Sequence, residues 1–87
     1  MTDSEFELLD ELYFVKSFEE IRSTLRWEDG KICETLGLLL EKGWIRCYKS
    51  PTDEILDGKI DLAGNCHNYF YLASKEGLVA HNSTEQL

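Results

Sequence analysis

Residues 27–45, WEDGKICETLGLLLEKGWI, decide the fold of this chain. Three apolar residues, spaced by four and then three positions, share one face of a helix: Ile32, Leu36 and Leu39. Gly43 predicts the end of that helix, because glycine adopts the left-handed backbone of many helix ends at little cost. Aromatic and β-branched residues dominate 44–48 and predict a strand. The stretch therefore predicts a helix, a sharp glycine turn and a strand.

Two capping-box patterns predict further helices upstream. Ser17 and Glu20, three residues apart, begin a shorter helix that ends before the turn at 26–30. Ser4 and Glu7 form a second such pair, which predicts a first helix from about Ser4. The short aromatic and β-branched segment 13–15 is expected to form a small strand between these helices. Helix, tight turn, helix, glycine and strand is the order of a winged helix-turn-helix.

Residues 17–48 resemble the helix-turn-helix and first wing strand of MarR-, ArsR- and PadR-type transcriptional repressors. Within them, residues 36–45 read L-x-x-L-x-E-K-G-W-I, similar to the family pattern L-x-x-L-x-x-K-G-[apolar]-I. Residues 69–78, YFYLASKEGL, resemble the strand and T-x-K-G that close the wing and begin a last helix. The resemblance covers most of residues 5–82. It implies an α+β winged helix with a three-helix core, a small β-wing with a long insertion and a short C-terminal helix, and a role in DNA-dependent transcriptional control.

Length and composition predict one domain. With 87 residues and 43% apolar content, the chain has enough material for one core. We expect a winged-helix domain over residues 1–82 and a disordered tail over 83–87. No apolar run approaches the roughly 18 residues of a membrane span, and no secretory segment follows Met1, so the expected location is cytoplasmic, away from membranes. Three cysteines without a C-x-x-C motif indicate neither a disulfide scaffold nor a standard zinc site: Cys33, Cys47 and Cys66.

The connection between the two expected wing strands is long. About 18 residues separate Lys49 from Asn68, whereas two to six are typical. Such length is typical of functional or disordered loops. Within it, residues 50–53, SPTD, predict a turn.

Residues 55–60, ILDGKI, place an Asp-Gly pair between apolar residues, which is a strong signal for a hairpin turn. A two-residue turn at this pair sets Ile55 opposite Ile60. The same register sets Glu54 opposite Asp61, an unfavourable pair of like charges. An irregular surface loop with a chance Asp-Gly pair is the alternative.

The charge distribution opposes the DNA-binding role that the resemblance implies. The formal net charge is -8, whereas a DNA-binding domain usually carries a basic patch. Residues 18–49 hold six acidic and six basic residues, while residues 50–68 hold four acidic residues against one lysine. An acidic wing repels the phosphates that it would have to contact. If DNA is bound, the contacts are expected from the basic residues and one threonine of the helix and wing: Lys31, Thr35, Arg46, Lys49 and Lys59.

The helix of residues 29–41 is apolar more than halfway round, which indicates that it buries a second face. One interpretation is that the long wing folds back, with Ile55, Leu56, Ile60 and Leu62 covering Leu38 and Leu40. The other is a protein-binding or homodimer surface formed by Leu38, Leu40 and Trp44. The second function hypothesis is therefore an acidic winged-helix interaction module that does not bind DNA.

Catalytic and metal-binding interpretations have little support in the sequence. Cys47, Cys66 and His67 are candidates for a zinc site, but neighbouring residues on a strand point to opposite faces. The acidic chain offers no electropositive setting for a cysteine nucleophile and no glycine-rich phosphate loop. His81 is expected as a cation at a helix end. We therefore predict a protein without enzymatic activity, cofactor or metal.

Overall fold

Four α-helices and one four-stranded antiparallel sheet make up residues 1–85, which are the residues that this computed structural model describes. The elements follow in the order α1 Asp3–Asp10, β1 Lys16–Ser17, α2 Phe18–Leu25, α3 Asp29–Glu41, β2 Ile45–Ser50, β3 Asp53–Ile55, β4 Phe70–Ala73 and α4 Lys75–Glu85. Two short 3-10 turns interrupt the connection from β3 to β4: η1 Asp57–Lys59 and η2 Cys66–Asn68. The predicted α+β class is confirmed.

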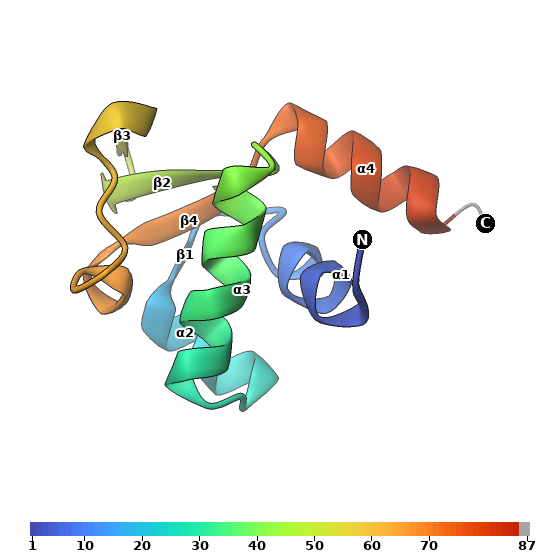
Figure 1. Ribbon diagram of the computed structural model, residues 1–87, viewed down its shortest axis with the longest axis horizontal. Coiled ribbons are helices and arrows are strands. Elements are labelled where there is room, and N and C mark those ends of the chain that lie inside the picture. The colour runs from blue at the N-terminus through green and yellow to red at the C-terminus, as the bar shows by residue number, and fades with distance from the viewer. Residues whose placement is uncertain (86–87) are drawn as a thin grey trace.

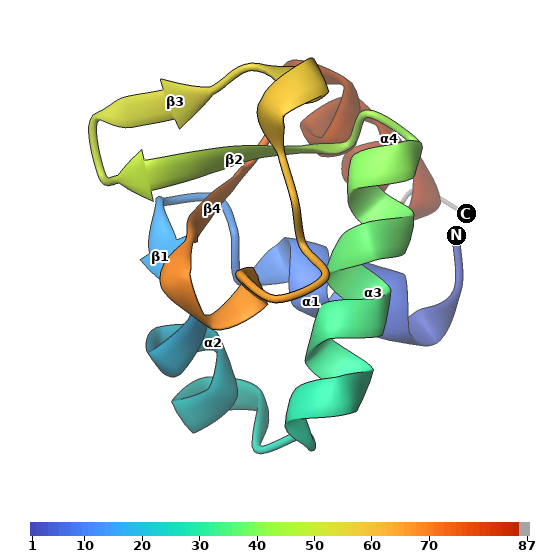
Figure 2. The same cartoon turned by 60° about the vertical axis from the view of Figure 1, so that its left-hand side comes forward.

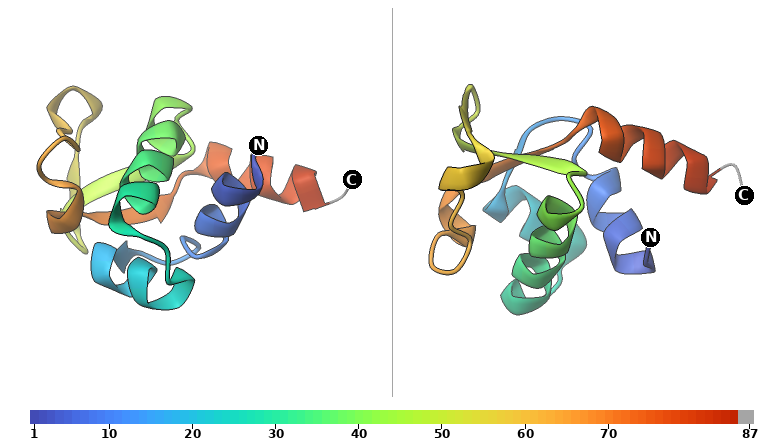
Figure 3. Two further views of the ribbon diagram at one scale, coloured as in Figure 1. Left: turned by 60° about the horizontal axis from the view of Figure 1, so that its bottom comes forward. Right: turned by 45° about the horizontal axis from the view of Figure 1, so that its top comes forward.

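The sheet has the order β1-β4-β2-β3, and α1, α2 and α3 lie on one side of it (Figures 1 and 3). In the central pair, Ile45 faces Ala73 and Cys47 faces Tyr71. These four residues are buried, while Arg46 between them is exposed. The sheet therefore buries one face against the helices, as its alternating pattern requires.

Helix α3 has the core face and the glycine end that the sequence predicts. Ile32, Leu36 and Leu39 are all fully buried. Gly43 has φ of 75°, its N–H donates to the Leu40 carbonyl at 3.0 Å, and the next N–H donates to the Leu39 carbonyl at 3.0 Å. This pair of hydrogen bonds is a Schellman motif, and it turns the chain directly from α3 into β2.

The capping prediction is confirmed for α2 and wrong for α1. Ser17 accepts from the Glu20 N–H and Glu20 accepts from the Ser17 N–H, as predicted. At α1 the same reciprocal bonds join Thr2 and Glu5 rather than Ser4 and Glu7. Thr2-x-x-Glu5 repeats the pattern two residues earlier, and this start places Leu8, Leu9 and Leu12 in the core.

The first strand lies later than the predicted segment 13–15. Strand β1 is Lys16–Ser17, which pairs with Tyr71 and Phe70 of β4. Phe14 is 78% exposed, whereas the Tyr13 hydroxyl lies 2.8 Å from Nδ1 of a histidine in α4. Of the aromatic residues after α1, Tyr13 therefore contacts α4 and Phe14 is exposed to solvent. Neither belongs to the sheet.

The hairpin of β2 and β3 turns at residues 51–52, within the predicted turn 50–53, and not at the Asp-Gly pair. Ile55 faces Cys47 of β2 instead of Ile60, and the Asp-Gly pair lies in η1. The observed register buries Ile55 against the sheet core, which the hairpin predicted at 55–60 does not do.

Helix α4 continues through residues 83–85, which the sequence assigns to a tail, and residues 86 and 87 lie outside the described part of the chain. His81 lies inside this helix and is 1% exposed, so its prediction as a helix-end cation is wrong. Its ring stacks on Phe6 of α1 with centroids 4.1 Å apart, and its Nε2 lies 3.4 Å from Asp10 Oδ1. The histidine is therefore the residue through which α4 docks on α1.

Candidate functional site

A groove of about 560 Å³ separates the start of α1 from the outer face of α3. We call it the acidic groove. Its α3 side consists of positions three and four residues apart, which share one helical face. Nine residues line it: Thr2, Ser4, Glu5, Glu28, Gly30, Lys31, Glu34, Thr35 and Leu38.

The floor of the groove contains a buried carboxylate held by two elements. Glu5 is 1% exposed, and its Oε2 accepts from Lys42 Nζ at 2.6 Å, while its Oε1 accepts from the Thr2 N–H at 2.8 Å. Burial acts to raise the pKa of Glu5, but the hydrogen bonds from Lys42 and Thr2 outweigh it, so this pKa lies below its ordinary value. The carboxylate is therefore charged near neutral pH and fixes α1 to the end of α3.

The rim of the groove is acidic and partly apolar. Glu28 and Glu34 are exposed, and neither has an ion-pair partner among the described residues. Lys31 Nζ lies over the Trp27 ring, 4.2 Å from its centroid. Leu38 is 41% exposed at the other end of the same helix face. The groove thus offers two carboxylates without an ion-pair partner in the described chain, together with one lysine and one leucine.

The structure divides the five predicted DNA-contacting residues between two places, the region of the β2-β3 hairpin and helix α3. Lys49 and Lys59 line a cavity of about 360 Å³ beside the β2-β3 hairpin, together with the acidic Asp53 and Glu54. Arg46 lies in β2, where its Nη1 pairs with Glu54 Oε2 at 3.2 Å. The cations of this hairpin region therefore lie among carboxylates.

The other two predicted contacts lie on α3. Thr35 is 4% exposed, and its hydroxyl donates to the Lys31 carbonyl at 2.8 Å, so this hydrogen bond occupies its donor. Lys31 itself is exposed but lies in the acidic groove, close to Glu28 and Glu34. The outer face of α3 therefore presents one cation among acids.

The three predicted interface residues do not form one surface. Leu38 lies in the acidic groove, whereas Leu40 lies beside Ile60 and Leu62 of the connection that follows β3. Leu40 and Trp44 are half-buried and pack against the core, and Lys42 Nζ lies 4.8 Å from the Trp44 ring centroid. The connection therefore covers the Leu40 side of α3, and Leu38 is left open.

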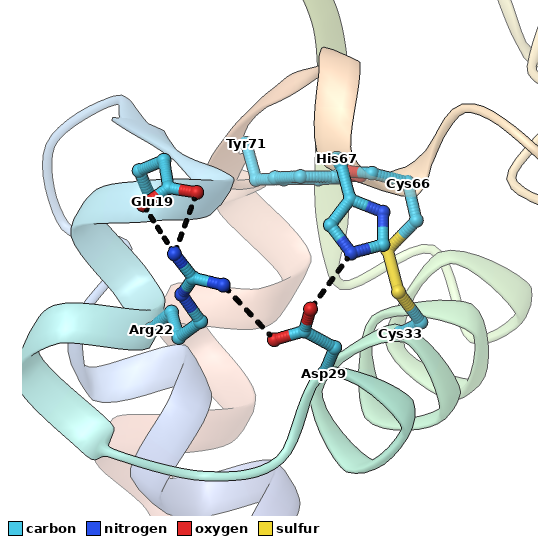
Figure 4. Close-up of polar contacts among 7 residues, drawn as sticks. All are labelled: Glu19, Arg22, Asp29, Cys33, Cys66, His67 and Tyr71. Carbon is cyan, nitrogen blue, oxygen red and sulfur yellow. Dashed lines mark hydrogen bonds and ion pairs between the residues drawn. A yellow bond between two sulfur atoms is a disulfide. The ribbon is translucent and has the colours of Figure 1, made fainter.

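A chain of polar contacts, which the sequence did not indicate, links α2, α3 and η2 (Figure 4). Arg22 pairs with Glu19 at 2.7 Å and with Asp29 at 3.5 Å, and Asp29 Oδ2 lies 3.1 Å from His67 Nε2. The hydrogen bond with His67 lowers the pKa of Asp29, against partial burial and with help from Arg22. The His67 ring also lies on Phe18, with centroids 4.2 Å apart. These contacts position η2 over the N-terminal ends of two helices.

Two of the three cysteines form a disulfide, which the cysteine pattern of the sequence did not indicate. Cys33 of α3 and Cys66 of η2 are bonded, with Cα atoms 6.0 Å apart (Figure 4). They are 33 residues apart in the sequence and meet because the long connection folds back onto α3. A disulfide fits an oxidising compartment better than the expected cytoplasm.

The zinc cluster of Cys47, Cys66 and His67, which the sequence did not favour, does not form, because Cys66 is bonded to Cys33. In the described part of the chain, no group of three or more histidine, cysteine or acidic residues is placed to hold a metal ion. The remaining thiol, Cys47, is buried, and burial raises its pKa to about 11. A thiol of this kind is protonated at neutral pH and is a poor nucleophile.

Comparison with known proteins gives no relative from which a function can be transferred. No protein-family model, no curated protein and no solved structure matches this chain. Among residues 1–85, no helix has the length and apolar character that crossing a membrane requires. The chemistry of the acidic groove and of the β2-β3 hairpin is therefore the basis for a functional proposal.

Proposed function

We propose that this chain is an acidic winged-helix interaction module, which binds a basic and partly apolar segment of a partner protein in the acidic groove. The observation that carries this proposal is the outer face of α3, where Glu28 and Glu34 have no ion-pair partner in the described chain and an exposed Leu38 follows one turn after Glu34. The net charge of -8 acts in the same direction, because it attracts cationic partners and repels nucleic acid.

The order of elements supports the winged-helix part of the proposal. Helices α2 and α3 are joined by a short turn, and the β2-β3 hairpin follows α3 directly, as a wing follows a recognition helix. The last strand β4 then pairs with both β1 and β2. In such a scaffold α3 is the helix that presents its outer face to a partner.

The dimensions and rigidity of the groove suit one short segment of a partner. Its volume of about 560 Å³ is enough for a few side chains, and its two walls are held together by the Glu5–Lys42 ion pair. A lysine or arginine of the partner meets the rim carboxylates, and an apolar side chain covers Leu38. Rim charges of this kind contribute mainly to association rate and specificity.

We expect Glu28→Gln/Glu34→Gln to weaken binding of a basic helical probe peptide by about fivefold, corresponding to roughly 1 kcal/mol. The probe is a synthetic 14-residue peptide of lysine and leucine at helical spacing, titrated into isotopically labelled protein. Amide chemical shifts give both the affinity and the location of the peptide. The largest shifts are expected at residues 28–38.

The matched control is Glu7→Gln/Glu76→Gln, which removes the same charge from exposed residues outside the groove. Equal weakening by both double variants, or shifts spread evenly over the surface, contradicts the proposal, since general attraction to an acidic protein then explains the binding. Leu38→Ser tests the apolar contact. It should also weaken binding of the peptide, while leaving the spectrum of the free protein unchanged.

A second candidate function, a DNA-binding transcriptional regulator, is favoured by the presence of Lys49 and Lys59 on one side of the wing. Each phosphate contact contributes about 0.9 to the slope of log affinity against log salt concentration. If the wing binds DNA, Lys49→Ala/Lys59→Ala should reduce that slope by about 2 in a fluorescence titration with a mixed-sequence duplex. Absence of binding to duplex DNA at about 50 mM salt rules this function out.

A further inference from the structure

We propose that the Cys33–Cys66 disulfide is a redox-controlled latch, which holds the connection of residues 56–68 against α3 and releases it when a dithiol reduces the bond. Figure 2 shows this connection passing alongside α3 on its way from β3 to β4. The disulfide joins it to α3 at η2. The latch lies on a different side of α3 from the acidic groove, so its test does not depend on any partner of the groove.

The connection has few other attachments to α3. The backbone hydrogen bonds that residues 56–65 make within the described chain all end inside the connection, for example from Lys59 N–H to the Leu56 carbonyl and from Gly64 N–H to the Leu62 carbonyl. They shape the loop but do not tie it to the helix. The polar attachments begin only at Cys66 and His67.

Apolar packing between the connection and α3 is incomplete. A hollow of about 300 Å³ lies between them, lined by Gly37, Leu40, Glu41, Ile60 and Leu62. A Cβ added to Gly37 would meet Leu62 Cδ1 at 3.8 Å, so the glycine leaves this contact unmade. Ile60 and Leu62 are half-buried against the core, but the hollow removes part of their dispersion contacts with α3, so packing holds the segment only in part.

The other contacts of η2 hold this turn to the sheet and to α2 more than to α3. The buried Tyr71 hydroxyl donates to the Cys66 carbonyl at 2.7 Å, and Phe18 of α2 lies under the His67 ring. Among the described residues, the polar contact of η2 with α3 is His67–Asp29, whose side chains are 54% and 44% exposed. Exposed contacts of this kind contribute little, so the covalent bond dominates the attachment to α3.

Opening the latch is a balanced thiol–disulfide exchange with a dithiol reductant. Cys33 is half-buried and Cys66 is 3% exposed, so a reductant thiolate attacks the Cys33 sulfur and displaces Cys66 as a thiolate, which takes up a proton. The second thiol of the reductant then attacks the reductant's first sulfur, which is bonded to Cys33 in the mixed disulfide. This breaks the mixed disulfide and releases Cys33 as a thiolate, which takes up a proton. Two electrons and two protons pass to the protein, and the reductant becomes a cyclic disulfide. The released segment uncovers Leu40, Ile60 and Leu62.

The test is hydrogen exchange measured by mass spectrometry on the whole chain, oxidised and then reduced with dithiothreitol. We expect residues 56–66 to exchange at least about tenfold faster after reduction, while peptides from α2 and β4 change less than about twofold. Unchanged exchange over 56–66 overturns the proposal. An equal increase in all peptides also overturns it, because the disulfide then stabilises the whole domain instead of one segment.

A double variant separates the latch from other effects of the reductant. Cys33→Ser/Cys66→Ser should show fast exchange over 56–66 without dithiothreitol and no further change when it is added. The matched ionic control is Asp29→Asn, which weakens the contacts of Asp29 with His67 and Arg22 but keeps the disulfide, and should leave the oxidised segment protected. If Asp29→Asn speeds exchange as much as reduction does, the ion pair is the attachment and the latch is disproved.

Discussion

Gly77→Ala is expected to destabilise the domain by about 3 kcal/mol or more, a large fraction of the stability of a domain of this size. A Cβ added at Gly77 would lie 2.0 Å from the Trp44 carbonyl oxygen and 2.9 Å from its carbonyl carbon. Both are backbone atoms, so no rotamer change relieves the overlap. Relief requires α4 to move away from the strand that follows α3. Thermal and urea unfolding followed by circular dichroism measure the effect.

The junction at Gly77 has little freedom to move. Ser74 accepts from the Gly77 N–H at 3.0 Å and donates to the Gly43 carbonyl at 2.7 Å. The Ser74 N–H in turn donates to the Trp44 carbonyl at 2.9 Å. Ser74 therefore links Gly77 of α4 to Gly43 and Trp44 by hydrogen bonds. A shift of α4 breaks these hydrogen bonds as well.

Gly37→Ala is the matched control for Gly77→Ala. Gly37 also lies in a helix, but a Cβ there would meet Leu62 Cδ1 at an ordinary contact distance of 3.8 Å. Alanine should stabilise α3 by about 0.5–1 kcal/mol, since it has the higher helix propensity. Equal destabilisation by the two substitutions would show that loss of glycine flexibility, and not the overlap with Trp44, determines the result.

Lys42→Met is expected to destabilise the protein by about 2 kcal/mol at pH 7. The substitution leaves the Glu5 carboxylate buried without its cation, and breaking a buried pair from one side is costly, although the half-exposed Lys42 reduces the effect. Methionine keeps most of the aliphatic length that packs near Trp44. The comparison is Lys49→Met, an exposed lysine with no ion pair among the described residues, which should cost less than about 0.5 kcal/mol.

The Lys42→Met effect should depend on pH. The native environment lowers the pKa of Glu5, so its stabilisation is complete above the ordinary value of 4.5 and is lost as pH falls through the lower native value. In the variant, burial acts without Lys42 and raises this pKa. The difference in unfolding free energy between the two proteins should therefore shrink below about pH 4.5. A difference that stays constant from pH 7 to pH 3 would show that lost packing, and not charge, causes the effect.

The local signals in the sequence were accurate where neighbouring residues decide the outcome. Ser17 with Glu20, the stripe from Ile32 to Leu39 and the left-handed Gly43 all have the predicted roles. Each depends on contacts within one or two turns of chain, and such contacts are set by residue spacing. At α1 the same pattern occurs twice, and burial of Leu8, Leu9 and Leu12 selects the earlier start.

The contacts that build the candidate site and dock the helices were harder to predict from the sequence, because their residues come from separate elements. Glu5 and Lys42 are 37 residues apart and meet only when α1 packs on α3. Tyr13 and His81, 68 residues apart, meet only when α4 docks on α1. Leu38 and Leu40 were assigned to one surface, but two residues along a helix point in nearly opposite directions, and the connection covers only one of them.

The sequence by itself determined the main helices, the glycine end of α3, the strands β2 and β4 and the acidic character of the chain, because these follow from local spacing and composition. Only the tertiary structure decided where the long connection lies. The hairpin predicted at 55–60 does not form, because Ile55 is buried opposite Cys47. Cys66 of the connection is bonded to Cys33, which lies 33 residues earlier in the sequence. Long-range burial and covalent pairing depend on which elements meet in space, and no spacing within a single segment encodes that.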